Sequence, residues 1–255
     1  MHPLLRPRRS GYGCVDPGTL SFEIAGDPTT YVLIHGGGGS AWDWHLLAPE
    51  LRARGAEAVA MDLPSDDESA GLAEYADAVV DAVGDRTGLV VVAHSFGGFT
   101  APLVCARLPV ELLVLVAAMV PAPGETGNDF WANTGHGRAF REQTGHDGSS
   151  DAVFYHDVAP ELVAEAKRRE RGQAETPGLE QWPLEAWPDV PTRFLLCRDD
   201  RMFPAEWTRR IVRERLGIVP DEIDGGHYIS ITRPKELADR LEAYRAEQQA
   251  SEGRT

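Results

Sequence analysis

The sequence predicts an α/β domain with a mainly parallel β-sheet flanked by helices. Apolar runs with the length of buried strands alternate along the chain with segments that have helical periodicity. The chain has 255 residues, enough for one large hydrophobic core. Hydrophobic residues make up 42% and charged residues 25% of it, the balance of an ordinary globular protein. We therefore expect a single domain over residues 1–255.

The first half of the chain supplies most of the expected elements. Five apolar runs bounded by turn residues predict strands at residues 19–25, 31–34, 56–61, 89–93 and 112–120. Apolar residues at helical spacing predict helices at residues 42–54, 72–83 and 99–108. Gly55 and Gly84 end the first two helices, because glycine favours the backbone conformation that follows a helix.

The alternation stops between residues 122 and 188. This segment has no strand pattern, but it has Gly-rich turns, three tryptophans and one charged helix, expected near residues 160–171. We expect a mostly helical cap inserted over one end of the sheet, with residues 17–121 and 189–249 as the core. Two strands and two helices complete that core, at residues 192–197, near 223, 205–216 and 234–248. The polar tail at residues 250–255 is expected to fray.

The charge of the chain argues against two classes of partner. Lys+Arg is 25 against Asp+Glu 40, a net charge of −15. Nucleic acids and anionic membrane surfaces both attract clustered cations, so we expect neither as a partner. No apolar run approaches the roughly 20 residues that span a bilayer. The basic residues 1–10 lack the apolar segment of a secretory signal, so we expect a loose leader.

The cysteines are few and odd in number: Cys14, Cys105 and Cys197. Such a set predicts no disulfide framework and is typical of a reducing compartment, so we expect a cytoplasmic protein. None of the three has Cys-x-x-Cys spacing, so no zinc site is expected. Nothing in the pattern predicts an oligomeric state.

The strongest chemical signal is the run from Ala93 to Gly97, Ala-His-Ser-Phe-Gly, at the end of an apolar strand. A strand that turns sharply into a helix at a serine lifts its hydroxyl above the sheet, and the crowded turn needs small residues two positions before and after it. The run is a variant of the G-x-S-x-G nucleophile elbow with Ala93 as the first small residue. We therefore predict that Ser95 is a nucleophile; the alternative is an ordinary helix N-cap serine.

A serine nucleophile needs a base, and the base needs an acid that orients it. At an elbow of this kind the chain order is serine, acid, histidine. Of the histidines after Ser95, only His227 follows a late strand, in a Gly-rich loop where it can reach the elbow. The remaining three lie in the cap, where they either line a pocket or are surface or hydrogen-bonded residues: His136, His146 and His156.

Two adjacent carboxylates follow the preceding strand, at Asp199 and Asp200. We favour Asp200 as the acid, because it lies just past that strand and Pro204 starts the next helix four residues later. The alternative is that both are solvated turn aspartates flanked by arginines.

The glycine run from Gly36 to Gly39 follows a strand and His35. It lacks the Lys-Ser/Thr of a phosphate-binding P-loop. We interpret it as an oxyanion loop, because glycines let backbone N–H groups approach a developing negative oxygen. The expected donors are the N–H groups of Gly37 and Phe96.

Together these motifs resemble the α/β-hydrolase fold family, over about residues 30–245. The glycine loop followed by Trp42 and Trp44 is similar to the branch that holds plant methyl-ester esterases, hydroxynitrile lyases and their bacterial relatives. The resemblance implies a serine esterase with a small cap, with no metal or organic cofactor. It places the triad on Ser95, Asp200 and His227.

The same branch distinguishes esterases from lyases. The lyases carry a threonine directly after the oxyanion-loop histidine and a lysine directly after the catalytic histidine. Gly36 and Tyr228 stand at those positions here, so we disfavour lyase activity of that type. The expected function is hydrolysis of a small neutral carboxylic ester, or a related acyl compound, through an acyl-enzyme. The alternatives are lyase-like C–C cleavage and a hydrolase-like binding protein with slow turnover.

Aromatic residues are the candidates for the substrate pocket. We expect Trp131 and Tyr228 to bind substrate. Phe96, Trp182 and Trp187 are further candidates for the apolar wall, and core packing is the equal alternative for the tryptophans. The cap has no residue-by-residue match to the family, so the substrate's acyl and alcohol groups are not predicted.

Overall fold

Among the residues that the structure describes, six parallel strands form one sheet in the order β2-β1-β3-β4-β5-β6. The computed structural model describes residues 28–144 and 150–253 of the chain. The strands are β1 (Thr30–Ile34), β2 (Glu57–Ala60), β3 (Leu89–Ser95), β4 (Val110–Ala118), β5 (Thr192–Cys197) and β6 (Asp221–Ile223). In the centre of the sheet Val32 pairs with Val59 on one side and Val91 on the other. Because every pair is parallel, the loops that follow the strands meet at one edge.

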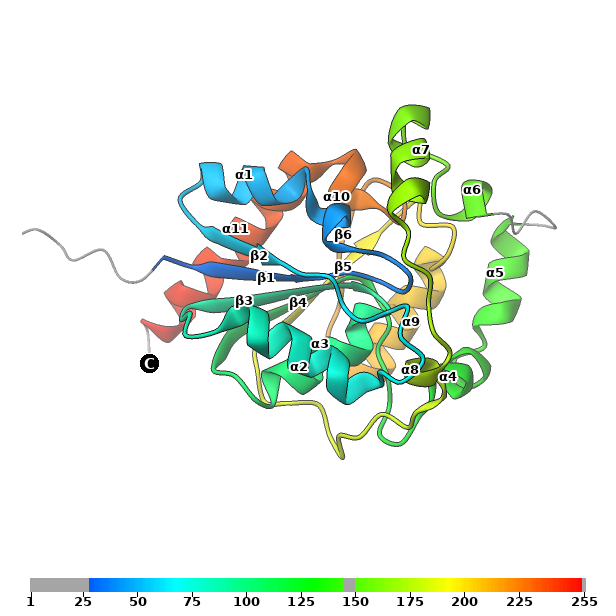
Figure 1. Ribbon diagram of the computed structural model, residues 1–255, viewed down its shortest axis with the longest axis horizontal. Helices are drawn as coiled ribbons and strands as arrows, with labels where there is room; N and C mark the ends of the chain where they lie inside the picture. The colour runs from blue at the N-terminus through cyan, green and yellow to red at the C-terminus, as the bar shows by residue number, and fades with distance from the viewer. Residues whose placement is uncertain (1–27, 145–149, 254–255) are drawn as a thin grey trace, which may run out of the picture.

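Helices cover both faces of the sheet, which the apolar strands β1 and β3 require (Figure 1). Helices α1 (Leu47–Ala53) and α11 (Pro234–Glu252) lie on one face, and α2 (Leu72–Val83) and α3 (Gly97–Cys105) on the other. Helix α9 (Ala205–Leu216) packs on β5, and the one-turn helices η1 (Ala41–Trp44) and α10 (Ile229–Thr232) lie in the loops after β1 and β6. Every residue of α3 is buried, because this helix lies between the sheet, α2 and the chain after β4.

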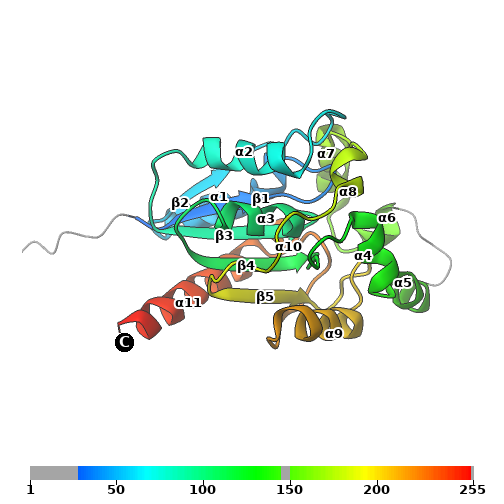
Figure 2. The same cartoon turned by 90° about the horizontal axis from the view of Figure 1, so that it is seen from below.

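The described part of the segment between β4 and β5 holds five short helices. They are α4 (Gly127–Asn133), α5 (His136–Thr144), α6 (Ser150–Val153), α7 (Pro160–Arg169) and α8 (Thr176–Leu179). They gather beyond the carboxyl ends of the strands, as the two orthogonal views show (Figures 1 and 2). The described residues of this segment, 122–144 and 150–188, contain no strand, in agreement with the prediction.

Several expected boundaries differ from the structure. The single helix expected at residues 42–54 is divided into η1 and α1. Pro49 has no backbone N–H and is therefore best accommodated in the first turn of a helix, and α1 begins two residues before it. The tail is helical as far as Glu252, where fraying was expected. Helix α10 was not expected, and the strand expected at 19–25 lies outside the described residues.

No helix within the described ranges is both long and apolar enough to cross a membrane.

The packing of α3 predicts that Gly98 is essential to the fold. A Cβ on Gly98 would overlap the carbonyl oxygen of Met119, which is rigid backbone. Gly98→Ala should therefore lower the free energy of unfolding by about 2 kcal/mol or more, measured by urea denaturation. Gly178→Ala in α8 is the matched control, because its Cβ meets nothing within 4 Å. Equal stability of the two variants would contradict this packing.

Candidate active site

The turn at Ser95 has the strained backbone of a nucleophile elbow. Strand β3 ends at Ser95, whose φ is +51°, in the left-handed region that residues with a side chain rarely adopt. Phe96 is the N-cap residue of α3, so Ser95 is not an ordinary N-cap serine. A Cβ on Gly97 would lie 2.8 Å from the carbonyl oxygen of His35, and a Cβ on Gly36 would lie 2.8 Å from Cβ of Ser95. The small residue expected at position 97 is thus explained by contact with the loop after β1.

His227 and Asp200 form a buried pair, 27 residues apart in the chain. Nδ1 of His227 lies 2.8 Å from Oδ2 of Asp200, and the side chains are 2% and 1% exposed. The other carboxylate oxygen, Oδ1, accepts the backbone N–H groups of Met202 at 2.8 Å and Phe203 at 2.9 Å. With the Nδ1 proton donated to the carboxylate, Nε2 of the neutral imidazole is the free acceptor.

Asp199 has a different task from Asp200. Asp199 is exposed. Its carboxylate accepts the backbone N–H of Gly225 at 3.0 Å, and its own backbone N–H donates to the Gly225 carbonyl at 3.0 Å. These two bonds tie the loop after β5 to the loop after β6. Asp199 therefore supports the chain that carries His227, and only Asp200 contacts the imidazole.

The backbone N–H groups of Gly37 and Phe96 come from adjacent loops. A Cβ built on Gly37 would lie 3.6 Å from Cβ of Phe96, so the two residues are in contact distance. Phe96 lies at the N-terminus of α3, where the helix dipole favours negative charge. Within the described residues, neither N–H group donates to a protein acceptor. This arrangement can accept an oxyanion next to Ser95.

Two further histidines, whose roles were not predicted, hold the site in place. His94 Nε2 donates to the carbonyl oxygen of His227 at 2.9 Å, and burial holds the pKa of His94 well below its usual value. His35 Nδ1 donates to the Gly36 carbonyl at 2.7 Å, and its Nε2 accepts the N–H of Leu63 at 3.0 Å. Burial also lowers the pKa of His35. Both imidazoles are therefore neutral hydrogen-bonding groups.

Ser95 and His227 both line a cavity of about 240 Å³. Three of the candidates for the substrate pocket line it: Phe96, Trp131 and Tyr228. Residues that the sequence did not predict complete the wall, many of them from the segment between β4 and β5: Met119, Ser150, Phe154, Tyr155, Glu170, Gln173 and Met202. The rings of Tyr155 and Tyr228 are stacked, with centroids 5.1 Å apart.

Other candidates lie away from this cavity. Trp182 and Trp187 pack in or against the core and donate to the carbonyls of Phe99 and Pro121, both at 3.0 Å, so the core-packing alternative is the right one for them. His136 and His156 bind backbone carbonyls of the loop after β5 and do not line the cavity. His146 lies outside the described residues.

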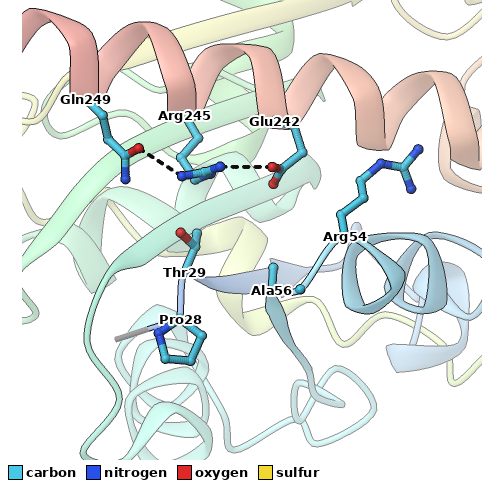
Figure 3. Close-up of a pocket in the computed structure, with 8 residues that line it drawn as sticks. Pro28, Thr29, Arg54, Ala56, Glu242, Arg245 and Gln249 are labelled. Carbon is cyan, nitrogen blue, oxygen red and sulfur yellow. Dashed lines mark hydrogen bonds and ion pairs between the residues drawn. The ribbon is translucent and has the colours of Figure 1, made fainter. Parts of the chain in front are cut away.

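A second hollow, of about 290 Å³, lies at the opposite edge of the sheet, where the strands begin (Figure 3). Pro28, Thr29 and Ala56 line it together with Arg245 of α11. The cations that line it have carboxylate partners within the protein: Arg245 donates to Glu242 at 3.0 Å, and Arg54 pairs with Glu50 at 2.8 Å and with Asp239 at 2.5 Å. It holds none of the predicted catalytic residues.

Comparison with known proteins agrees with this fold. Residues 31–240 match the model of the alpha/beta hydrolase family, and the chain belongs to that family. It is 38% identical over 109 residues to a probable esterase, PIR7A, of Oryza sativa; this match covers 37% of the chain and only 41% of the rice protein. It is 23% identical to Methylesterase 1 of Arabidopsis thaliana, over 82% of the chain and 93% of the relative. The crystal structure of polyneuridine aldehyde esterase superposes with a TM-score of 0.70 at 20% identity, covering 86% of this chain and 99% of that one.

Asp43 is a buried acid beside the site. It lies in η1, its residue is 7% exposed, and its Oδ2 has no hydrogen-bond partner within the described residues. Burial raises the pKa of Asp43 to about 7, and the negative charge of Asp62 adds to this shift. The carboxyl is protonated in the folded protein over a pH range where it is ionised in the unfolded chain.

The raised pKa of Asp43 predicts a pH-dependent stability. Below about pH 4 the group is neutral in both states; above that, only the unfolded chain releases the proton, so stability falls as pH rises toward 7. Asp43→Asn should remove this loss. The free energy of unfolding of Asp43→Asn minus that of the wild type should be about 3 kcal/mol larger at pH 8.5 than at pH 5, as measured by urea denaturation. The exposed Asp81→Asn should keep the wild-type slope; an unchanged slope in Asp43→Asn would contradict the burial of a protonated acid.

Proposed function

We propose that the protein is a serine hydrolase that cleaves a carboxylic ester, or a related acyl bond, of a small neutral substrate. The observation that carries the proposal is the buried Asp200–His227 pair, which opens into the same cavity as the strained Ser95. The esterase and methylesterase names of its relatives support the same reaction class.

The proposed reaction uses the three side chains in sequence. Ser95 Oγ attacks the carbonyl carbon while His227 Nε2 takes its proton, and Asp200 stabilises the imidazolium that forms. The N–H groups of Gly37 and Phe96 bind the oxyanion. The C–O bond then breaks, and His227 returns the proton to the leaving alcohol. Water, deprotonated by His227, attacks the acyl-enzyme and releases the acid and Ser95.

The cavity supports a neutral ester as substrate. Its described lining includes Glu170 and several aromatic rings but no lysine or arginine, so an anionic substrate would lack a partner there. We also propose that residues 122–188 act as a cap within one domain, because Trp131, Phe154 and Gln173 from this segment form part of the wall. The reaction needs neither a metal nor an organic cofactor.

Lyase-like cleavage has less support. Gly36 offers no hydroxyl group to hold a cyanohydrin, and Tyr228 offers no fixed cation to stabilise departing cyanide. Tyr228 is instead stacked on Tyr155. A binding protein with slow turnover shares the same geometry, and kinetics separates it from an enzyme.

The location we propose is cytoplasmic. Cys105 and Cys197 are buried and unpaired, which fits a reducing compartment.

The nucleophile is tested with Ser95→Ala. The wild-type protein should turn over p-nitrophenyl acetate steadily and react with a fluorophosphonate probe, because both need an activated serine. Ser95→Ala should lose the labelling and at least about 10³-fold in kcat. Full activity in the variant would show that Ser95 is not the nucleophile. A wild-type protein that is labelled once but does not turn over would be a binder.

The two aspartates are tested by a matched pair of variants. Asp200→Asn should lower kcat by up to about 10⁴-fold, because an amide facing Nδ1 favours the wrong imidazole tautomer. Asp199→Asn should stay within a few-fold of wild type in kcat on p-nitrophenyl acetate. The opposite ranking would move the role of the acid to Asp199.

A further inference from the structure

The oxyanion loop is bonded to a distant segment of the chain. Both backbone polar groups of Gly38, the residue directly after Gly37, have partners there: its N–H donates to Gln173 Oε1 at 3.1 Å, and its carbonyl accepts the Arg171 N–H at 3.0 Å. Gly38 has a φ of +66° and Gly172 a φ of +86°, and a Cβ on Gly38 would lie 3.6 Å from the Gly172 carbonyl carbon. The two backbones therefore touch directly. Within the loop itself, the only described backbone bond is a long one, from Gly39 N–H to the Gly36 carbonyl at 3.3 Å.

The partners of Gln173 fix the direction of its carboxamide. Nε2 donates to the Tyr75 hydroxyl at 3.1 Å and to the Ala174 carbonyl at 2.9 Å. A carbonyl only accepts and the Gly38 N–H only donates, so the reverse orientation of the amide would lose both bonds. Tyr75 lies in α2 and is 1% exposed, so the amide is anchored to the core. The Gln173 Oε1 is also only 3.2 Å from where a Cβ on Gly37 would lie.

The segment that carries Gln173 is held at both ends. The Arg171 guanidinium pairs with Asp62 at 3.1 Å and Asp66 at 2.7 Å, and the Ala174 N–H donates to the Ser65 carbonyl at 2.6 Å. These partners all lie in the loop after β2. The segment is therefore a fixed support, and Gln173 is the side chain by which it reaches the oxyanion loop.

We propose that Gln173 is a positioning residue for the reaction: its carboxamide holds the Gly37–Gly38 backbone so that the Gly37 N–H points at the developing oxyanion. A run of four glycines has many accessible backbone conformations, and a clamp on its third residue restricts them. The hydrogen bond from the Gly37 N–H to the substrate oxygen strengthens as negative charge develops on that oxygen. Gln173 therefore affects the stability of the transition state more than the binding of the substrate. This inference rests on the proposed hydrolase function.

The test compares Gln173→Met with Gln181→Met. Methionine matches the length of glutamine without its hydrogen bonds, and the Gln173 residue is exposed, so the variant should fold with an unchanged Tm. We expect kcat on p-nitrophenyl acetate to fall about 10- to 100-fold, less than for a removed oxyanion donor, with KM within about twofold. Gln181 is an exposed residue beyond α8 in the same segment, and its variant should match wild type.

A second readout separates positioning from a merely structural role. The Ser95 hydroxyl adds to the carbonyl carbon of an alkyl trifluoromethyl ketone and forms a hemiketal oxyanion. The matching methyl ketone only occupies the cavity. Gln173→Met should lower the affinity for the trifluoromethyl ketone by the same factor as kcat and leave the affinity for the methyl ketone unchanged. Tyr75→Phe removes one hydrogen-bond partner of the Gln173 amide. It should lower kcat and the affinity for the trifluoromethyl ketone about threefold and leave the affinity for the methyl ketone unchanged. This variant keeps the test available if Gln173→Met does not fold.

Unchanged kcat and unchanged trifluoromethyl ketone affinity in both variants would overturn the role of Gln173. Equal weakening of both ketones together with a lower Tm would also overturn it, because that pattern reports general loosening of the site. Ser95→Ala, measured in parallel, keeps the two proposals apart. If it abolishes activity while Gln173→Met changes nothing, only this inference fails; if Ser95→Ala retains activity, the proposed function fails.

Discussion

The left-handed turn at Ser95 is the constraint to which the surrounding structure conforms. A residue with a side chain pays about 1–2 kcal/mol for such a backbone conformation, so its neighbours must leave it no better choice. The loop after β1 and the chain after β4 supply these neighbours, because both strands flank β3 in the sheet. Gly36, Gly97 and Gly98 have no side chains because these segments approach one another too closely for a Cβ. The position of Ser95 thus follows from the strand order.

The segment between β4 and β5 contributes more than a wall to the cavity. Its side chains bond to the backbone of the loops that carry Asp200 and His227. Gln143 donates to the Asp200 carbonyl at 2.6 Å, His156 to the Asp199 carbonyl at 2.9 Å, and Asp157 accepts the Gly226 N–H at 2.7 Å. Exchange of this segment for another would alter the cavity wall and the placement of these two loops together.

Features encoded over short stretches of sequence were predictable. The apolar strands, the sharp turn after β3 and the convergence of Ser95 and His227 on one cavity follow from local pattern and from the parallel sheet. The cap was not predictable in detail, because its helices are short and its contacts are made between residues distant in the chain. Gln173 is an example, since its partners Gly38 and Tyr75 are 135 and 98 positions away. Trp131 and Trp182 could not be separated by composition, because an apolar ring suits a cavity wall and a core equally well.

The bond from His94 to the main chain of His227 links two distant parts of the chain. His94 directly precedes Ser95, so this bond connects the segments of Ser95 and His227 across 133 positions of sequence. The burial that disfavours a charged His94 keeps its imidazole neutral. Because a neutral imidazole still donates this bond, the link between the two segments does not depend on a charged group.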